Sequence, residues 1–176
     1  MRKTNAVKVA VLVIMLGGAV YLALRQRAPH PLAIGDRAPS FSIPQVPSGT
    51  MELQKYQGQV IVVNLWATWC PPCVDETPSL VGFAEKMRDH GVVVLGVSVD
   101  ENLEALREFV KKYHIGYPIG RDPDRALSAR FGTSVFPETY IFDRRGLLAE
   151  KVIGPTDWDD PRMQNFVLDL ARGAKP

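Results

Sequence analysis

Two continuous runs of apolar residues constrain the fold of this chain more than any other feature. Residues 60–65 (VIVVNL) and 92–97 (VVVLGV) are rich in β-branched side chains and contain no charged one. Runs of this kind are typical of strands that are covered on both faces, and such strands occur mainly in parallel sheets flanked by helices. A length of 176 residues fits one domain with an appendage. We therefore expect a layered α/β domain.

Helical patterns and further strands surround the two runs. Leu80, Phe83, Ala84 and Met87 recur at helical spacing, and Gly91 would end that helix. The segment over 28–47 holds five prolines and predicts an irregular, partly extended lead-in. Other expected elements are a hairpin around 51–53, a helix over 103–113, a short helix over 125–131, strands at 139–143 and 147–153, and a last helix capped by Asp160 with Pro161 as its first residue.

The charges are distributed unevenly along the chain. Residues 1–27 carry five basic side chains and no acidic one, whereas the remaining 149 residues carry 16 basic and 19 acidic side chains. Proteins that bind nucleic acid present a clustered basic face. The balance in the body of the chain therefore argues against nucleic-acid binding.

A run of 16 uncharged, mainly apolar residues lies between Lys8 and Arg25. As a helix it would extend roughly 24 Å, or roughly 28 Å with three flanking residues, against a hydrocarbon core of about 30 Å. A cleaved signal peptide and a buried helix are the alternatives, although bulky residues crowd the position where a cleavage site needs small ones. We expect residues 1–27 to form a membrane anchor, 28–34 a linker and 35–176 the domain.

The basic residues also predict an orientation in the membrane. Three of them and the amino group precede the apolar run, and two follow it. The positive-inside rule then places the N-terminus in the cytoplasm. We expect a single-pass protein of the inner (cytoplasmic) membrane, with its domain on the extracytoplasmic, periplasmic side.

The chain contains only two cysteines, Cys70 and Cys73, shortly after the first apolar run. A structural disulfide framework uses several well-separated cysteines, and closing a ring of four residues removes little loop entropy. At helical spacing the two thiols lie one turn apart, within reach of a disulfide. The pair therefore indicates redox chemistry rather than stabilisation.

The position of each cysteine predicts its role. Cys70 would open a helix, where the dipole and free N–H groups stabilise a thiolate and lower its pKa, so we expect it to be the attacking sulfur. Cys73 would be the resolving sulfur that releases a mixed disulfide. Pro71 and Pro72 fit a first turn but remove two N–H donors that could face the thiolate. This loss predicts a less acidic Cys70 and a reducing bias.

Three nearby residues are candidates for supporting roles. Glu76 lies one turn beyond Cys73, where it could exchange a proton with that thiol or merely serve the helix dipole. Pro78 should leave the carbonyl of Val74 without a donor and kink the helix. Trp66 is expected to pack internally, and Trp69 to pack or to form part of a docking surface.

The sequence argues against a metal or haem site. Structural zinc needs two further ligands, and His30, His90 and His114 show no paired ligand spacing. Haem attachment requires a histidine after the second cysteine, where Val74 stands. We expect no cofactor beyond the disulfide, with copper binding by the two thiolates as an alternative.

The motif from Asn64 to Cys73 (NLWATWCPPC), followed by Glu76 and Pro78, resembles the thioredoxin superfamily and, within it, the TlpA/ResA/DsbE-type membrane-tethered oxidoreductases. The likeness covers residues 33–172 and includes the GDRAPSF opening at 35–41. It implies a thioredoxin-like fold, a central mixed sheet flanked by helices, behind an N-terminal transmembrane helix.

The resemblance also implies further site residues. Phe136 and Pro137 look like the loop that bears the family's cis-proline, and with Trp69, Pro71 and Pro72 they would form the substrate-binding surface. The bare sequence would equally allow a trans proline before a strand. One departure is Asn64, which stands where thioredoxin has a buried aspartate, so Glu76 becomes the candidate substitute for that carboxylate.

The combined expectation is a membrane-anchored protein-disulfide reductase. The resemblance implies clients among exported proteins, commonly apocytochrome c before haem attachment, and a membrane thiol carrier as electron donor. A disulfide oxidase and a copper metallochaperone are the alternatives. A peroxidase is disfavoured because the paired thiols lack the upstream threonine context that the nucleophiles of peroxidase families use.

Overall fold

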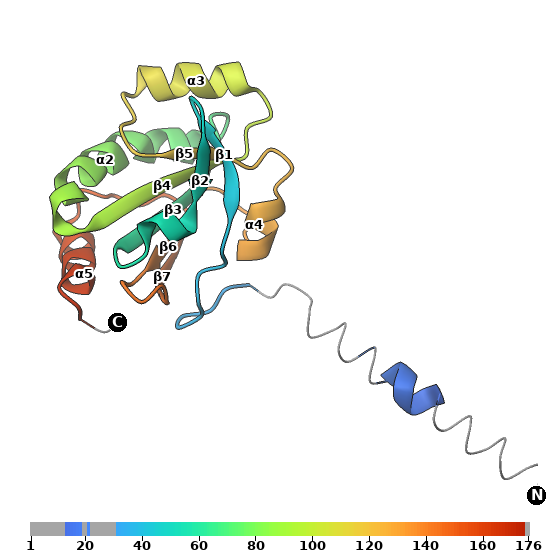
Figure 1. The fold of residues 1–176 in the computed structure, drawn as a ribbon. Coiled ribbons are helices and arrows are strands. Elements are labelled where there is room, and N and C mark those ends of the chain that lie inside the picture. Colours follow the sequence, from blue (N-terminus) through green and yellow to red (C-terminus); the bar gives the residue numbers. More distant parts are fainter. Residues whose placement is uncertain (1–12, 19–20, 22–30, 175–176) are drawn as a thin grey trace, which may run out of the picture. The chain divides into compact units, whose positions relative to one another are not determined.

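The computed structural model describes residues 13–18, 21 and 31–174 (Figure 1). The chain divides into two compact units, Met1–His30 and Pro31–Pro176. In the first unit residues 13–18 are helical, and the side chains of Val13, Ile14, Met15 and Leu16 are exposed. The predicted anchor falls largely outside the described residues. Among those described, no helix combines the length and apolarity needed to cross a membrane.

A mixed seven-stranded sheet forms the centre of the second unit (Figure 1). Its strands are β1 (Ser42–Val46), β2 (Thr50–Glu52), β3 (Val60–Trp66), β4 (Val92–Ser98), β5 (Ile119–Arg121), β6 (Glu138–Phe142) and β7 (Leu148–Ile153). They lie in the order β2-β1-β5-β4-β3-β6-β7. β3 pairs in parallel with β4 and antiparallel with β6. The two apolar runs of the sequence are therefore the central parallel pair.

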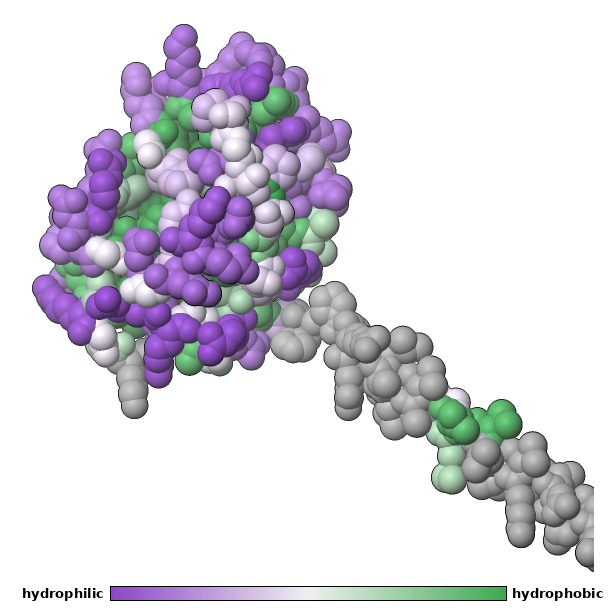
Figure 2. Space-filling view, in the orientation of Figure 1, coloured by the Kyte–Doolittle hydropathy of each residue, from purple (hydrophilic) through white to green (hydrophobic). Residues whose placement is uncertain are grey.

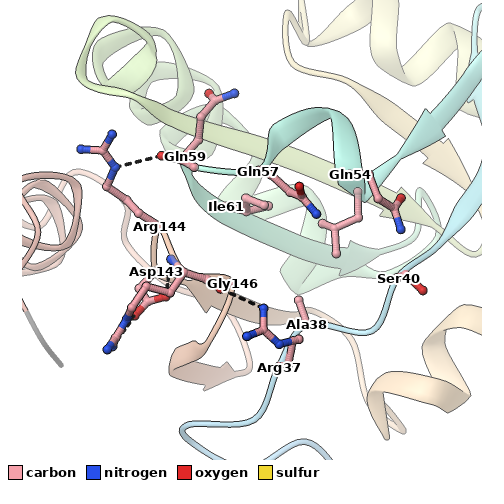
Figure 3. A pocket seen from close by; sticks show the side chains of 13 residues that line it. Arg37, Ala38, Ser40, Gln54, Gln57, Gln59, Ile61, Asp143, Arg144 and Gly146 are labelled. Atoms are coloured by element: carbon pink, nitrogen blue, oxygen red, sulfur yellow. Dashed lines mark hydrogen bonds and ion pairs between the residues drawn. The ribbon is translucent and has the colours of Figure 1, made fainter.

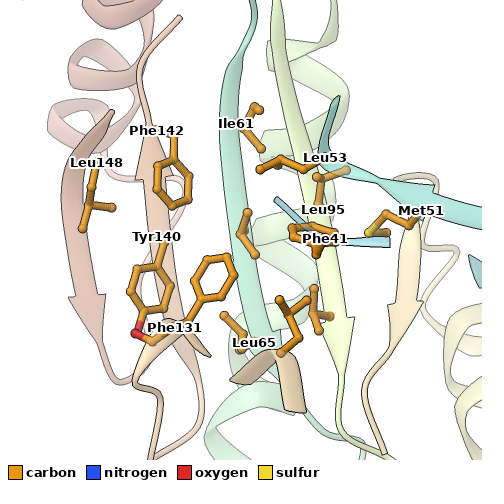
Figure 4. Packing of buried hydrophobic residues seen from close by; sticks show 13 residues of the cluster. Phe41, Met51, Leu53, Ile61, Leu65, Leu95, Phe131, Tyr140, Phe142 and Leu148 are labelled. Carbon is orange, nitrogen blue, oxygen red and sulfur yellow. The ribbon is translucent and has the colours of Figure 1, made fainter. Parts of the chain in front are cut away.

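Helices cover the sheet on both faces. They are α2 (Pro71–Met87), α3 (Leu103–Lys112), α4 (Ala126–Phe131) and α5 (Pro161–Ala171), with short 3-10 turns η1 (Leu53–Tyr56) and η2 (Arg88–His90). Side chains of α2 and α5 pack on Val60, Val62 and Val94 on one face. On the other face α4 contributes to the cluster around Tyr140 and Phe142 (Figure 4).

A third buried cluster lies at the carboxyl ends of β3 and β4 and contains both cysteines. Trp66, at the end of β3, packs against Phe109 of α3 with ring centroids 5.0 Å apart. Hydrophilic side chains predominate on the face of this unit seen in Figure 2. The packing of Trp66 on Phe109 supports the end of the sheet that carries the cysteines.

Most predicted elements are confirmed, with ends shifted by one or two residues. Gly91 ends the α2–η2 segment in the left-handed region (φ 73°), and the Asp160 carboxylate accepts a hydrogen bond from the Arg162 N–H at the start of α5. The lead-in, predicted to be irregular and partly extended, is extended at residues 42–46, which form the regular strand β1. β1 gains its backbone partners from β2 and β5, and β5 itself has no clear sequence signal.

Candidate active site

The two cysteines occupy the start of α2. β3 ends at Trp66, and after a short turn Cys70 stands as the N-cap, with Pro71 and Pro72 in the first turn. Cys70 and Cys73 form a disulfide, with Cα atoms 5.3 Å apart. Cys70 is 5% exposed and Cys73 1%. Both cysteines are buried, and Cys70, the slightly more exposed residue, stands at the positive end of the helix.

A buried aspartate fixes the turn that precedes Cys70. Asp100 follows β4 and accepts hydrogen bonds from the Thr68 N–H at 3.0 Å and from the Thr68 hydroxyl at 2.6 Å. The Ser98 hydroxyl also donates to it at 2.7 Å. Charge-assisted hydrogen bonds of this length are strong, so the turn is tied to the neighbouring strand end. Nothing in the local sequence pattern singled out Asp100.

The cis-proline loop lies beside this turn. The Phe136–Pro137 peptide is cis, as the resemblance implied. Leu65 of β3 pairs with Glu138 of β6, so Pro137 directly precedes a residue paired with the end of β3. The Phe136 ring meets Trp69 edge-on at 6.4 Å between centroids, and Trp69 is 57% exposed. An exposed aromatic wall therefore borders the disulfide.

Glu76 is buried on the sheet-facing side of α2. Its Oε1 accepts a hydrogen bond from the Asn64 side chain at 2.9 Å, and its Oε2 accepts one from the Thr156 N–H at 3.0 Å. Burial raises the pKa of this carboxyl above its usual value, and these hydrogen bonds offset part of the rise. Cys73 and Glu76 lie one turn apart, both buried. Glu76 is thus a buried carboxyl with a raised pKa, one helical turn from Cys73.

The alternative role for Glu76 at the helix dipole is not supported, because it lies beyond the first turn of α2. Pro78 lies inside α2 and cannot donate to the Val74 carbonyl, as expected. In the preceding turn the Thr77 hydroxyl donates to the Cys73 carbonyl at 2.7 Å. Asn64 stands where thioredoxin has a buried aspartate, and its side-chain amide contacts Glu76 directly.

A groove of about 440 Å³ lies beside Trp69, which directly precedes Cys70. Its walls come from the turn before Cys70, the β4–α3 loop and one residue ahead of α4: Thr68, Trp69, Asp100, Glu101, Asn102 and Arg125 are among them. Arg125 has no local sequence signal for such a place, since it lies 56 residues after Trp69. The structure alone brings it to the site.

A second cavity, of about 380 Å³, lies at the opposite end of β3 (Figure 3). Its arginines are engaged: Arg144 Nε donates to the Gly58 carbonyl at 2.8 Å, and Arg145 binds Asp143. Neither cysteine lines it. His90 and His114, dismissed as ligands from their spacing, are exposed on the domain.

Comparisons with known proteins identify the family of the chain. The chain matches the AhpC/TSA family over residues 34–151. It is 27% identical over 157 residues to the thiol-disulfide oxidoreductase ResA of Bacillus thuringiensis, covering 88% of this chain and 91% of that protein. It is 34% identical over 135 residues to the thiol:disulfide interchange protein DsbE of Allochromatium vinosum, covering 75% and 72% of the two chains.

A solved structure shows the same architecture. The crystal structure of a thiol:disulfide interchange protein of the thioredoxin family from Chlorobium tepidum superposes with a TM-score of 0.69 at 27% identity, covering 77% of this chain and 98% of that one. With the cysteine pair at the mouth of α2, these matches place the chain in the AhpC/TSA family of thioredoxin-fold proteins, as a thiol-disulfide oxidoreductase of the ResA and DsbE type.

Proposed function

We propose that the protein is a membrane-anchored reductant of disulfides in exported proteins. The observation that carries the proposal is the position of Cys70, at the N-cap of α2 and next to the exposed Trp69. A thiolate there is stabilised by the helix, and the aromatic wall offers a surface for an extended client segment.

The reaction begins with the reduced pair. The Cys70 thiolate attacks one sulfur of the client disulfide, forming a Cys70–client bond and releasing the other client sulfur as a thiolate. Cys73 then attacks the Cys70 sulfur, which forms the Cys70–Cys73 disulfide and releases the second client thiol. The client gains two electrons and the protein loses two. A dithiol carrier in the membrane would restore the reduced pair by the same exchange.

Glu76 supplies the proton step in this proposal. Cys73 must lose its proton before it attacks, and Glu76 lies one turn away on the same buried side of α2. A carboxyl whose pKa is raised by burial holds its proton more readily than an exposed glutamate and can both take and return one. Asn64 and Thr156 hold its two oxygens, which makes them positioning residues.

The first turn of α2 supports the proposed reducing direction. Pro71 and Pro72 have no N–H groups, so two donors that would stabilise a Cys70 thiolate are absent. A less stabilised thiolate makes the reduced pair a better electron donor. A disulfide oxidase needs the opposite balance.

Anchoring and location rest on the N-terminal sequence. The apolar run between Lys8 and Arg25 is long enough, with its flanks, to cross a bilayer, and its described part exposes apolar side chains. We place the domain on the periplasmic side of the inner membrane and propose apocytochrome c as the client. Support for this client comes from the resemblance of the cysteine motif.

The test is a trapping experiment with the full-length protein. Cys73→Ser should accumulate a mixed disulfide between Cys70 and its client, whereas Cys70→Ser should accumulate none. Identification of an exported protein in the trapped complex would support the proposal. A reduction potential near the roughly −270 mV of thioredoxin fits a reductant, and one near the roughly −120 mV of DsbA would overturn the proposed direction.

A further inference from the structure

The Arg125 side chain contacts both rings of the aromatic wall, Trp69 and Phe136. Its guanidinium carbon lies 6.0 Å from the centroid of the Trp69 ring and 5.8 Å from that of Phe136. Trp69 immediately precedes Cys70, and Phe136 immediately precedes the cis Pro137. Cation–π contact at these distances holds the guanidinium against the rings. A positive charge therefore lies on the border of a groove that is also lined by Trp69, the residue before Cys70.

The guanidinium has all its donors available for a ligand. Within residues 31–174 its recorded contacts are the two rings, and it has no hydrogen bond or ion pair there. Arg121 differs, because it donates to the backbone carbonyls of Asp100 and Glu101. Arg130 likewise donates to the carbonyl of Ser40. A planar guanidinium with five free N–H groups is well suited to a carboxylate.

The backbone holds Arg125 in an unusual conformation. Its φ is 57°, in the left-handed region that side-chain-bearing residues rarely adopt. The Arg125 N–H donates to the Asp122 carbonyl at 3.0 Å, and the buried Asp122 carboxylate accepts from Leu127 and Ser128. The left-handed conformation of Arg125 costs free energy, and the hydrogen bonds of Asp122 hold the turn in place. In this conformation the Arg125 side chain lies against the two rings.

The acidic residues around the groove differ in their burial and in their hydrogen-bond partners. Asp100 is buried and binds Thr68 and Ser98. Glu101 is exposed and lines the groove. Asp124 is exposed, and its carboxylate accepts a long hydrogen bond from the Ala126 N–H. The groove thus has an unpaired cation at Arg125 and an exposed acid at Glu101, and a bound segment would meet the two in a fixed order.

We propose that Arg125 selects client disulfides that carry a carboxylate close to the attacked cysteine. The client is a peptide segment lying along Trp69, with an Asp or Glu side chain paired to Arg125. This inference rests on the proposed function, because it assumes that client disulfides are reduced at Cys70. It adds a preference that the cysteine pair alone does not predict.

The experiment uses three disulfide peptides that differ only in the residue next to one cysteine: Asp, Ala or Lys. The reduced full-length protein is mixed with each peptide at low ionic strength, and the rate constant of its oxidation is measured. We expect the Asp peptide to react about fivefold faster than the Lys peptide, a preference that weakens with added salt. Arg125→Glu should reverse the order, Arg125→Gln should abolish it, and Arg125→Lys should retain its sign.

The Ala peptide reports any loss caused by altered ring packing, and the Asp-to-Lys ratio removes that loss from the comparison. Arg172→Glu, an equal charge reversal at the end of α5, is the matched control and should leave the ratio unchanged. Equal rates for all three peptides, or an unchanged ratio in Arg125→Glu, would overturn the role of Arg125 alone. If the wild-type protein reduces none of the peptides, the proposed function fails and this inference falls with it.

Discussion

The side-chain amide of Asn64 donates a hydrogen bond to Glu76 at 2.9 Å and a second one to the Thr139 hydroxyl at 3.0 Å. Asn64 lies in β3, Glu76 in α2 and Thr139 in β6. One neutral amide therefore joins the helix that carries the cysteines to both strands behind it. It also leaves Glu76 as the ionisable member of this buried group.

The raised pKa of Glu76 predicts a pH-dependent stability. Between the usual glutamate pKa and the higher folded value, the folded protein binds more protons than the unfolded chain, so the free energy of unfolding falls as pH rises. Glu76→Gln removes this slope and should be more stable than the wild type at neutral pH. Its amide can bind the Thr156 N–H and, after the Asn64 amide turns over, the Asn64 oxygen. Urea unfolding from about pH 4 to about pH 8 measures the difference.

Glu85→Gln is the control for this experiment, because Glu85 lies on the exposed side of the same helix. It should give a curve parallel to that of the wild type. If Glu76→Gln is also parallel to the wild type, the carboxyl is not perturbed by burial and the argument is wrong.

The same substitution should slow the chemistry. Without a carboxyl near Cys73, the release of the mixed disulfide loses its proton acceptor, and we expect a fall of about tenfold or more. Single-turnover reduction of a peptide disulfide across pH measures the rate. The part of the pH dependence of the rate that comes from the Glu76 carboxyl should disappear as well. A variant that is equally fast at every pH would exclude Glu76 from the proton step.

The two thiols should differ in reactivity once the disulfide is reduced. Cys70 is the slightly more exposed residue, at 5% against 1% for Cys73, and it stands at the helix N-terminus. Iodoacetamide should label Cys73→Ser, which keeps Cys70, at least about tenfold faster than Cys70→Ser at neutral pH. Mass spectrometry over time follows the labelling. Equal labelling would remove the basis for assigning separate roles to the two sulfurs.

Asp122 should be important for stability as well as for the placement of Arg125. Its buried carboxylate accepts hydrogen bonds from the Leu127 N–H and from the N–H and hydroxyl of Ser128 at 2.7 to 2.9 Å. Asp122→Ala leaves these donors without a partner and should cost about 2–3 kcal/mol in urea unfolding. Asp124→Ala, at an exposed neighbour, should cost less than about 0.5 kcal/mol. Similar losses in both variants would contradict a specific role for the buried carboxylate.

Gly132 ends α4 in the left-handed region (φ 76°), and a Cβ there would lie 2.6 Å from the Pro31 Cα. Gly132→Ala should therefore cost more than the roughly 1 kcal/mol expected from the conformation alone. Gly91→Ala isolates that conformational cost, because Gly91 has φ 73° and open space around its Cβ position. Thermal unfolding of the two variants should show the larger loss at Gly132. Equal losses would mean that Pro31 moves aside freely.

Elements with strong local patterns were predictable from the sequence. The runs over 60–65 and 92–97 became the central strands because their continuous apolar character requires burial on both faces. β1 and β5 were not predictable, since β1 contains a proline and β5 has only three residues. They exist because they pair with each other and with established neighbours. Local propensity carries no information about such pairing.

The site shows the same division. The Cys70–Cys73 pair was found from a short motif, because a disulfide depends on residue type and spacing, and the cis Pro137 was expected only from the family resemblance. The partners of Glu76 and the contact of Arg125 with Trp69 were not found, because they join segments brought together only by the packing of helices on the sheet. A basic residue before a short helix gives no sign of where its side chain will lie.

β3, which leads to the cysteine turn, and β6, which follows the cis Pro137, pair antiparallel with Leu65 opposite Glu138. The two segments that carry the site are therefore neighbours in one hydrogen-bonded ladder. Neither segment can move far without breaking hydrogen bonds between these central strands. Loss of activity on heating should therefore coincide with global unfolding rather than precede it. In this scaffold the rigidity of the site and the resistance of the fold to heat should change together.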